Sequence, residues 1–221
     1  MQNIIEFRRR VEKLEVENVR YCLMTLYLFC GRISEVVSKK CPSDKRTTPR
    51  GPRGEDARID VYQAGETKHE AVVFTVRTAK RDGLERRVAV PLEFEPWAKP
   101  VYEYFRKHVG EPVFPFTQQY VRNVCYENRL FDSLQYYVYT YTAKGLKREG
   151  HYRRFNLHAI RHMRASELVE YYGFTGPELA IYGGWTFKTM GFPGATDRYL
   201  SLSWQLYFPK LLKKTVVDVV Q

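Results

Sequence analysis

The sequence predicts an α+β fold that is mainly α-helical and holds a small antiparallel β-sheet. Three observations predict it. Apolar residues recur at helical spacing in 5–29, Asn156 and Gly173 are plausible start and stop signals for a helix over 157–172, and short segments rich in Val, Ile, Phe and Thr lie between 58 and 90 with turn residues between them. With 221 residues, 44% of them hydrophobic, the chain is long enough for one packed domain and too short for two large ones. We therefore expect one domain over residues 1–221.

The N-terminal part is expected to be helical. Apolar side chains recur every three or four residues in 5–29, which predicts one or two helices that end at Gly31. Ser34 is a good N-cap and Glu35 follows it, so another helix is expected to begin near Ser34. Arg32 is then expected at a corner between two helices.

The middle of the chain is expected to form the sheet. Residues 58–62, 71–78 and 86–90 have the composition of short strands. The Asp-Gly pair at 82–83 is a strong turn signal between the last two strands. Lys80 therefore falls at the end of a strand, beside a hairpin turn.

The C-terminal half returns to helical patterns. Thr117 is the expected cap of a helix over 118–130, and Asn156 that of a helix over 157–172. Residues 131–142 are left open, because a tyrosine-rich stretch with strand composition lies inside helical surroundings.

The composition favours a nucleic-acid partner. Lys and Arg exceed Asp and Glu by 36 to 25, which gives a net charge of +11 and suits an extended polyanion such as double-stranded DNA. Charge alone also fits ribosomal and membrane-surface proteins. No apolar run is long enough to span a bilayer, and the first ten residues lack a signal-peptide core, so we expect a cytoplasmic protein without a membrane partner.

The cysteines predict no metal site. Cys22, Cys30, Cys41 and Cys125 form no Cys-x-x-Cys pair and have no nearby His at ligand spacing. Reduced thiols in the core of a cytoplasmic protein are favoured over a disulfide, which the sequence leaves open.

Cutting and rejoining DNA without a metal or ATP requires fixed cations, because the attacked phosphate gains negative charge on its non-bridging oxygens. Arginine suits this role best, since its planar fork holds two oxygens at once and keeps its charge. Arg32 and Arg161 are the candidates. Residues three apart share a helix face, so His158 and Arg161 are expected to lie together.

The same chemistry needs a nucleophile and proton carriers. A Tyr phenol, with an ordinary pKa of about 10, attacks slowly at neutral pH unless cations lower that pKa and a His takes its proton. Tyr199 is the candidate nucleophile and His158 the candidate proton carrier. Lys80 is the candidate acid for the departing sugar oxygen, with Arg81 as its rival. Trp185 offers one indole N–H to a phosphate oxygen.

Four short motifs carry most of these residues in a fixed order. They are Gly31-Arg32-Ile33-Ser34-Glu35-Val36, His158-Ala159-Ile160-Arg161-His162, Gly184-Trp185 and Asp197-Arg198-Tyr199-Leu200. Together with the hairpin that ends in Val90-Pro91-Leu92, they resemble the motifs of the tyrosine recombinase family. Each motif alone is weak, whereas the ordered set is much harder to obtain by chance.

The resemblance implies a tyrosine recombinase catalytic domain and a set of roles. It implies Arg32 and Arg161 as the phosphate clamp, Lys80 as general acid, His158 as acid and base, Trp185 as a further donor and Tyr199 as nucleophile. The implied function is site-specific DNA recombination or integration through a 3′-phosphotyrosyl intermediate without a cofactor, by a homo-tetramer on DNA that can be a monomer in solution. Glu35 is expected to be a structural partner of Arg32.

Alternatives stay open beside this interpretation. A type IB topoisomerase-like nicking-closing enzyme uses similar residues on one duplex, and a DNA-binding module descended from a recombinase uses none of them for catalysis. Family members usually carry a helical DNA-binding domain before the catalytic one, so we expect a catalytic fragment or a minimal form. The apolar residues after Leu206 suggest a tail that docks on a neighbouring copy.

A run of basic residues precedes His158. Its members are Lys144, Lys147, Arg148, Arg153 and Arg154. Their position makes contact with the DNA backbone about as probable as simple exposure to solvent.

Overall fold

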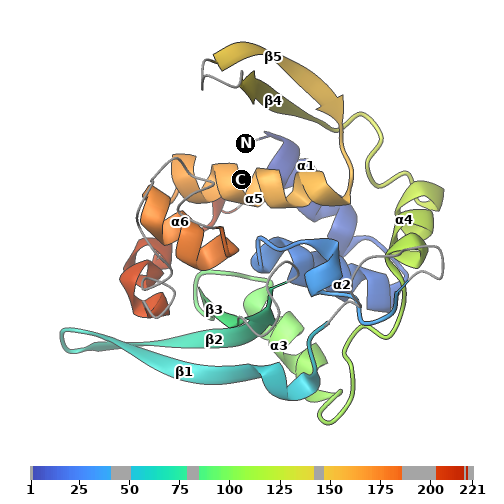
Figure 1. The fold of residues 1–221 in the computed structure, drawn as a ribbon. Helices are drawn as coiled ribbons and strands as arrows, with labels where there is room; N and C mark the ends of the chain where they lie inside the picture. The colour runs from blue at the N-terminus through green and yellow to red at the C-terminus, as the bar shows by residue number, and fades with distance from the viewer. Residues whose placement is uncertain are drawn as a thin grey trace.

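The computed structural model describes residues 2–40, 51–78, 85–141, 147–185, 203–216 and 218. It confirms the α+β class: the described ranges contain six α-helices, a three-stranded antiparallel sheet and a two-stranded hairpin (Figure 1).

The first two helices form part of the core. Helix α1 spans Gln2–Glu12 and α2 spans Glu17–Leu28, as the apolar spacing predicts. Helix α2 buries most of its residues and contacts α1, α3 (Ala98–Arg106) and α5 (Leu157–Glu170). After α2 the chain turns sharply at Cys30, whose φ of 46° is unusual for a residue other than glycine.

The prediction of an α-helix that begins near Ser34 is wrong. The structure has instead a single 3-10 turn, η1, at Ile33–Glu35, in which Arg32 rather than Ser34 is the N-cap residue. The side chain of Glu35 accepts a hydrogen bond from the backbone N–H of Arg32 and is itself almost fully buried. Because Glu35 is drawn inward by buried arginines, the chain leaves the helical path after one turn.

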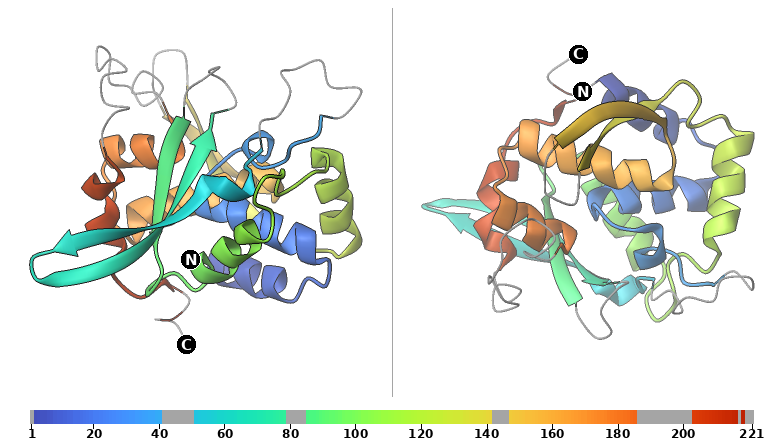
Figure 2. Two further views of the ribbon diagram at one scale, coloured as in Figure 1. Left: turned by 90° about the horizontal axis from the view of Figure 1, so that it is seen from below. Right: turned by 45° about the horizontal axis from the view of Figure 1, so that its top comes forward.

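The three-stranded sheet confirms the expected strands. Strands β1 (Ala57–Ala64), β2 (Thr67–Arg77) and β3 (Glu85–Pro91) pair in that order, and a second 3-10 turn, η2 (Gly54–Asp56), leads into β1. The turn expected at 82–83 lies outside the described residues. Strand β1 is mostly exposed and extends with β2 as a long hairpin beyond the body of the molecule (Figures 1 and 2).

The segment left open by the sequence contains a strand. Helix α4 spans Gln118–Glu127, and the Thr117 side chain caps it by accepting from the backbone N–H of Tyr120, as expected. Strand β4 (Gln135–Tyr141) then pairs with β5 (Lys147–Arg154). This hairpin lies alongside α5 in Figure 1 and in the right-hand view of Figure 2.

Helices α5 and α6 are set by local signals. The Asn156 side chain accepts from the backbone N–H groups of His158 and Ala159 and so begins α5 as predicted. Helix α6 spans Gly176–Gly183 and ends at Gly184, which has a left-handed φ of 69°.

The described part of the C-terminal segment, residues 203–216, packs on its own chain, and the expected docking of the apolar tail on a neighbouring copy stays a prediction. Two 3-10 turns, η5 (Trp204–Leu206) and η6 (Phe208–Leu211), contact β3. Leu211 and Val216 are buried here, and Leu212 packs against the core. Val217, Val219 and Val220 of the expected docking surface lie outside the described residues.

One core joins these layers. Phe29 of the α2 end, Phe74 of β2 and Phe105 of α3 meet with ring centroids 5.2 to 6.4 Å apart. Cys22, Cys30 and Cys125 are free buried thiols, as the sequence favours, and Cys41 is outside the described ranges. Of the helices that the structure describes, none combines the length and apolar character needed to cross a bilayer.

Candidate active site

Four of the six predicted catalytic residues lie in described parts of the chain. They are Arg32, His158, Arg161 and Trp185. Lys80 and Tyr199, together with the rival Arg81, lie outside the described residues.

Arg32 lies at the corner after α2, where the motif places it. Its Nη1 donates to Oε1 of Glu35 at 3.2 Å, which confirms the expected pairing of these two residues. The side chain of Arg32 is 25% exposed, whereas that of Glu35 is 1% exposed. Arg32 therefore forms the solvent-facing edge of the site.

Arg86, on β3, is a second cation on Glu35. Its Nη2 lies 3.0 Å from Oε2 of Glu35 and also donates to the carbonyl oxygen of Phe29 at 3.1 Å. The side chain of Arg86 is 3% exposed. In the described structure, its Nε and Nη1 have no hydrogen-bond partner.

Arg161, on α5, lies near the same carboxylate. Its Nη1 lies 4.0 Å from Oε2 of Glu35, beyond hydrogen-bond range, and has no hydrogen-bond partner among the described residues. Its Nη2 donates to the carbonyl oxygen of Gly183 at 2.9 Å, and its guanidinium carbon lies 3.9 Å from the ring centroid of Trp185. Arg161 is thus held in place while one end of its fork stays available.

The turn after α6 brings Trp185 to Arg161. The backbone N–H groups of Gly184 and Trp185 both donate to the carbonyl oxygen of Ala180, at 2.8 and 3.1 Å. A Cβ at Gly183 would overlap the Trp185 ring, and one at Gly184 would lie 2.8 Å from Nε of Arg86. The two glycines therefore allow the indole and the Arg86 guanidinium to approach the backbone closely.

Positive side chains outnumber negative ones in this site. We use the term arginine cluster for Arg32, Arg86 and Arg161 with Glu35. Burial, together with repulsion from Arg32 and Arg86, lowers the pKa of Arg161 to about 10, although Cys30 and Glu35 oppose this shift. Burial alone would raise the pKa of Glu35, but Arg86 and Arg161 hold it below its ordinary value. Three guanidinium groups therefore face one carboxylate, which gives these described groups an excess of positive formal charge.

His158 lies at the edge of the arginine cluster. It is exposed at the start of α5, and its ring is 4.8 Å from that of His162 in an edge-on arrangement. Partial burial lowers the pKa of His158, and repulsion from Arg161 and Arg32 adds to that effect. The imidazole is therefore neutral at pH 7 and able to accept a proton. The expected proximity of His158 and Arg161 is confirmed.

The predicted DNA-backbone residues are only partly described. Lys144 lies outside the described residues, and the side chains of Lys147 and Arg148 on β5 are not described. Arg153 and Arg154 are exposed at the end of β5, immediately before the N-terminus of α5. Arg153 also contributes to lowering the pKa of His162, after burial and the repulsion from His158 and Arg161.

Sequence reasoning missed Arg86. A signal for it was present, since Arg86, Val88 and Val90 alternate with period two and share the inward face of β3, which is buried at all three positions. An arginine on the apolar face of a strand is costly unless it meets a partner or a ligand.

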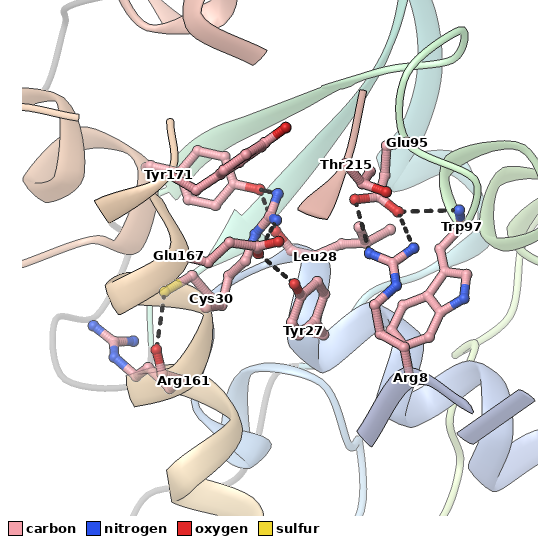
Figure 3. A network of polar contacts seen from close by, with 12 residues as sticks. Arg8, Tyr27, Leu28, Cys30, Glu95, Trp97, Arg161, Glu167, Tyr171 and Thr215 are labelled. Carbon is pink, nitrogen blue, oxygen red and sulfur yellow. Dashed lines mark hydrogen bonds and ion pairs between the residues drawn. The ribbon is translucent and has the colours of Figure 1, made fainter. Parts of the chain in front are cut away.

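Beneath the site lies a second set of buried charges, which we call the paired network. Arg8 donates to Glu95 at 2.7 Å, and Glu167 accepts from Arg164 and from the hydroxyl of Tyr27. Figure 3 shows Arg161 joined to this region through its carbonyl oxygen, which accepts from the thiol of Cys30 at 3.4 Å, while its guanidinium turns away from Glu167.

No protein-family model matches this chain, and neither a curated protein nor a solved structure matches it. Its resemblance to tyrosine recombinases therefore rests on the local motifs. Within the described ranges, no group of three or more His, Cys, Asp or Glu side chains could hold a metal ion.

Proposed function

We propose that this protein is a site-specific DNA recombinase or integrase of the tyrosine recombinase type, which cleaves and rejoins DNA through a 3′-phosphotyrosyl intermediate. The observation that carries the proposal is the meeting of Arg32, His158, Arg161 and Trp185, from three separate motifs, around a buried guanidinium nitrogen, Nη1 of Arg161, that has no hydrogen-bond partner among the described residues. A cluster with excess positive charge suits a phosphate whose negative charge grows during the reaction.

The proposed roles of Arg32, Arg161 and His158 follow from these positions, and those of Lys80 and Tyr199 from the resemblance to tyrosine recombinases. Arg32 and Arg161 hold the non-bridging oxygens of the scissile phosphate, and Trp185, whose ring centroid lies 3.9 Å from the Arg161 guanidinium carbon, offers its indole N–H as a further donor. The phenolic oxygen of Tyr199 attacks phosphorus as His158, neutral at pH 7, accepts the phenol proton. The bond from phosphorus to the 5′ oxygen breaks, and Lys80 protonates that oxygen. The reverse sequence reseals the strand without a nucleotide cofactor.

The substrate of this proposal is double-stranded DNA, bound by a homo-tetramer that holds two duplexes. The net charge of +11 favours such a polyanion, and the exposed Arg153 and Arg154 precede the helix that carries His158 and Arg161. The proposal also includes the fold: we propose that the observed α+β architecture is that of a tyrosine recombinase catalytic domain.

The direct test is a covalent trap. The protein is incubated with a pool of random-sequence duplexes carrying a nick, so that the cleaved end diffuses away and a denaturant-resistant adduct accumulates. We expect an adduct with the native chain and with Tyr126→Phe, a matched control because Tyr126 is 86% exposed and lies on α4. Tyr199→Phe should bind DNA with unchanged affinity and give no adduct.

The other outcomes separate the alternatives. An adduct that persists in Tyr199→Phe moves the nucleophile to another tyrosine. If the adduct forms, but the protein only relaxes an intact supercoiled plasmid and makes no joints between two duplexes, the type IB topoisomerase-like activity is favoured. DNA binding without an adduct on any substrate favours the non-catalytic module.

A further inference from the structure

The two edges of the three-stranded sheet differ in what covers them. At the β3 edge, the backbone N–H of Ala89 donates to the hydroxyl of Tyr207 at 2.9 Å, and η5 and η6 contact the strand. At the other edge, no strand in the described ranges pairs with β1 on the side away from β2. Strand β1 runs along the lower left border of the molecule in Figure 1. Its outer edge therefore keeps backbone N–H and C=O groups available to a further strand.

Two opposite charges lie on one face of β1. The side chains of Arg58 and Asp60 are 54% and 41% exposed, and Nη2 of Arg58 is 3.7 Å from Oδ2 of Asp60, beyond hydrogen-bond range. Oδ1 of Asp60 accepts from the backbone N–H of Val61 at 2.9 Å. An ion pair this loose and this open to solvent contributes little to the stability of one chain. Both charges are therefore available to closer partners on an added strand.

The opposite face of β1 is apolar and extends the core face of the sheet outward. Ala57 is opposite Phe74 of β2 and Ile59 is opposite Val72, and both β2 residues are buried. Ile59 and Val61 themselves are exposed. Exposed apolar side chains on an unpaired edge are suited to pairing with another strand.

The order of residues in β1 identifies a second copy of the same strand as the partner. Two identical antiparallel strands related by a two-fold axis pair around a residue that lies opposite its own copy. Pairing around Arg58 or Asp60 would oppose like charges, and pairing around Val61 would oppose each charge to an uncharged residue. Pairing around Ile59 sets Arg58 opposite Asp60 of the other copy at both ends. It also sets Val61 opposite Ala57 of the other copy, so that apolar residues face apolar residues.

We propose that the outer edge of β1 joins two copies of this chain by antiparallel strand pairing around Ile59. Opposite charges and apolar side chains directly across such a pair stabilise it. The dimer is expected to be weak, because each copy carries a net charge of +11 and the two copies repel each other. The inference goes beyond the proposed function, since this pairing needs neither DNA nor cleavage.

Sedimentation equilibrium of the full chain without DNA tests the pairing, at about 0.15 M salt, where repulsion over distances greater than roughly 8 Å is screened. The native chain should form a reversible dimer as its concentration rises. Arg58→Asp opposes carboxylates at both ends of the pair and should weaken the dimer by about tenfold or more. This change also lowers the net charge, which by itself favours association. Arg87→Asp makes the same charge change at an exposed position on β3 and should not weaken the dimer.

A mixture of two variants tests the register. Asp60→Arg opposes guanidinium groups at both ends and should weaken the dimer when it is the only chain present. When Asp60→Arg is mixed with Arg58→Asp, opposite charges meet again at both ends. A heterodimer, followed through a fluorescent label on one chain, should then form about as tightly as the native dimer. Its formation requires both chains to be folded, so recovery excludes misfolding as the cause of the two losses.

Three outcomes would overturn the inference. They are a native chain that remains a monomer up to the limit of its solubility, an Arg58→Asp variant that dimerises as well as the native chain, and a mixture that shows no recovery. Failure of the proposed function looks different, since it removes the Tyr199-dependent adduct and leaves the sedimentation results intact.

Discussion

The arginine cluster and the paired network are both buried and both built on arginine, yet they balance charge differently. The paired network sets Arg8 and Arg164 against Glu95 and Glu167. Attraction to these carboxylates outweighs the effect of burial and raises the pKa of both arginines. In the arginine cluster three arginines face Glu35, and the pKa of Arg161 falls to about 10.

This contrast separates a structural role from a binding role. A protein gains little by burying unmatched charge, because each uncompensated group costs free energy of folding. Excess positive charge is instead what an anion site requires. The paired network is therefore expected to govern stability, and the arginine cluster to govern activity.

Breaking the paired network should have the largest effect on stability. Glu95→Gln leaves Arg8 as an uncompensated buried cation while keeping an oxygen for the backbone N–H of Trp97. We expect the free energy of unfolding, measured in urea, to fall by about 3–5 kcal/mol. The double variant Arg8→Met/Glu95→Gln should recover most of this loss. A single variant as stable as the native chain would show that the network is not structural.

The corresponding change in the arginine cluster should affect cleavage instead. Arg161→Met removes the clamp and should slow adduct formation by about 3 kcal/mol, or roughly 10²–10³-fold. Its free energy of unfolding should change by no more than about 1 kcal/mol, because lost contacts to Gly183 and Trp185 are offset by relief of repulsion from Arg32 and Arg86. A loss of stability comparable to that of Glu95→Gln would erase the distinction between the two regions.

The sequence predicts the fold well where local signals are strong. Thr117 and Asn156 cap their helices as expected, and strand-forming composition locates β1, β2 and β3. It fails where distant contacts decide the local structure. Ser34 looks like a helix cap, but Glu35 turns inward to reach Arg86 on β3 and limits the segment to one 3-10 turn.

The site shows the same division. Motif spacing identifies Arg32, His158, Arg161 and Trp185, because each lies in a short recognisable pattern. Arg86 belongs to no motif, and its role depends on where β3 meets the α2 corner and the turn at Gly184. Likewise, the apolar composition of the tail does not reveal that its described part contacts β3 and α6 of the same chain.

Two tryptophans sharpen the comparison at a smaller scale, because each stacks on one arginine. Trp97 lies 4.1 Å from Arg8 in the paired network, and Trp185 lies 3.9 Å from Arg161. Trp185→Phe should weaken the stacking and slow adduct formation by about 1 kcal/mol with little change in stability. Trp97→Phe should lower stability by a similar or larger amount and leave adduct formation unchanged in the folded protein. The reverse pattern would contradict the assignment of the two regions.

The smallest expected effect is a change in the pKa of His158, which senses the excess charge of the arginine cluster. Burial lowers this pKa below 6.5, and repulsion from Arg161 and Arg32 lowers it further. Arg32→Met removes one of these cations and should raise the pKa, measured by NMR titration of the imidazole. His162 is an internal control, because burial, His158, Arg161 and Arg153 lower its pKa without a contribution from Arg32.

The same shift makes stability depend on pH. Since folding favours the neutral form of His158, its contribution to stability is lost as pH falls from about 6.5 through the lower folded pKa, and Arg32→Met should reduce that loss. An unchanged pKa of His158, or equal shifts in both histidines, would mean that the charge of Arg32 is not felt at the proposed proton carrier.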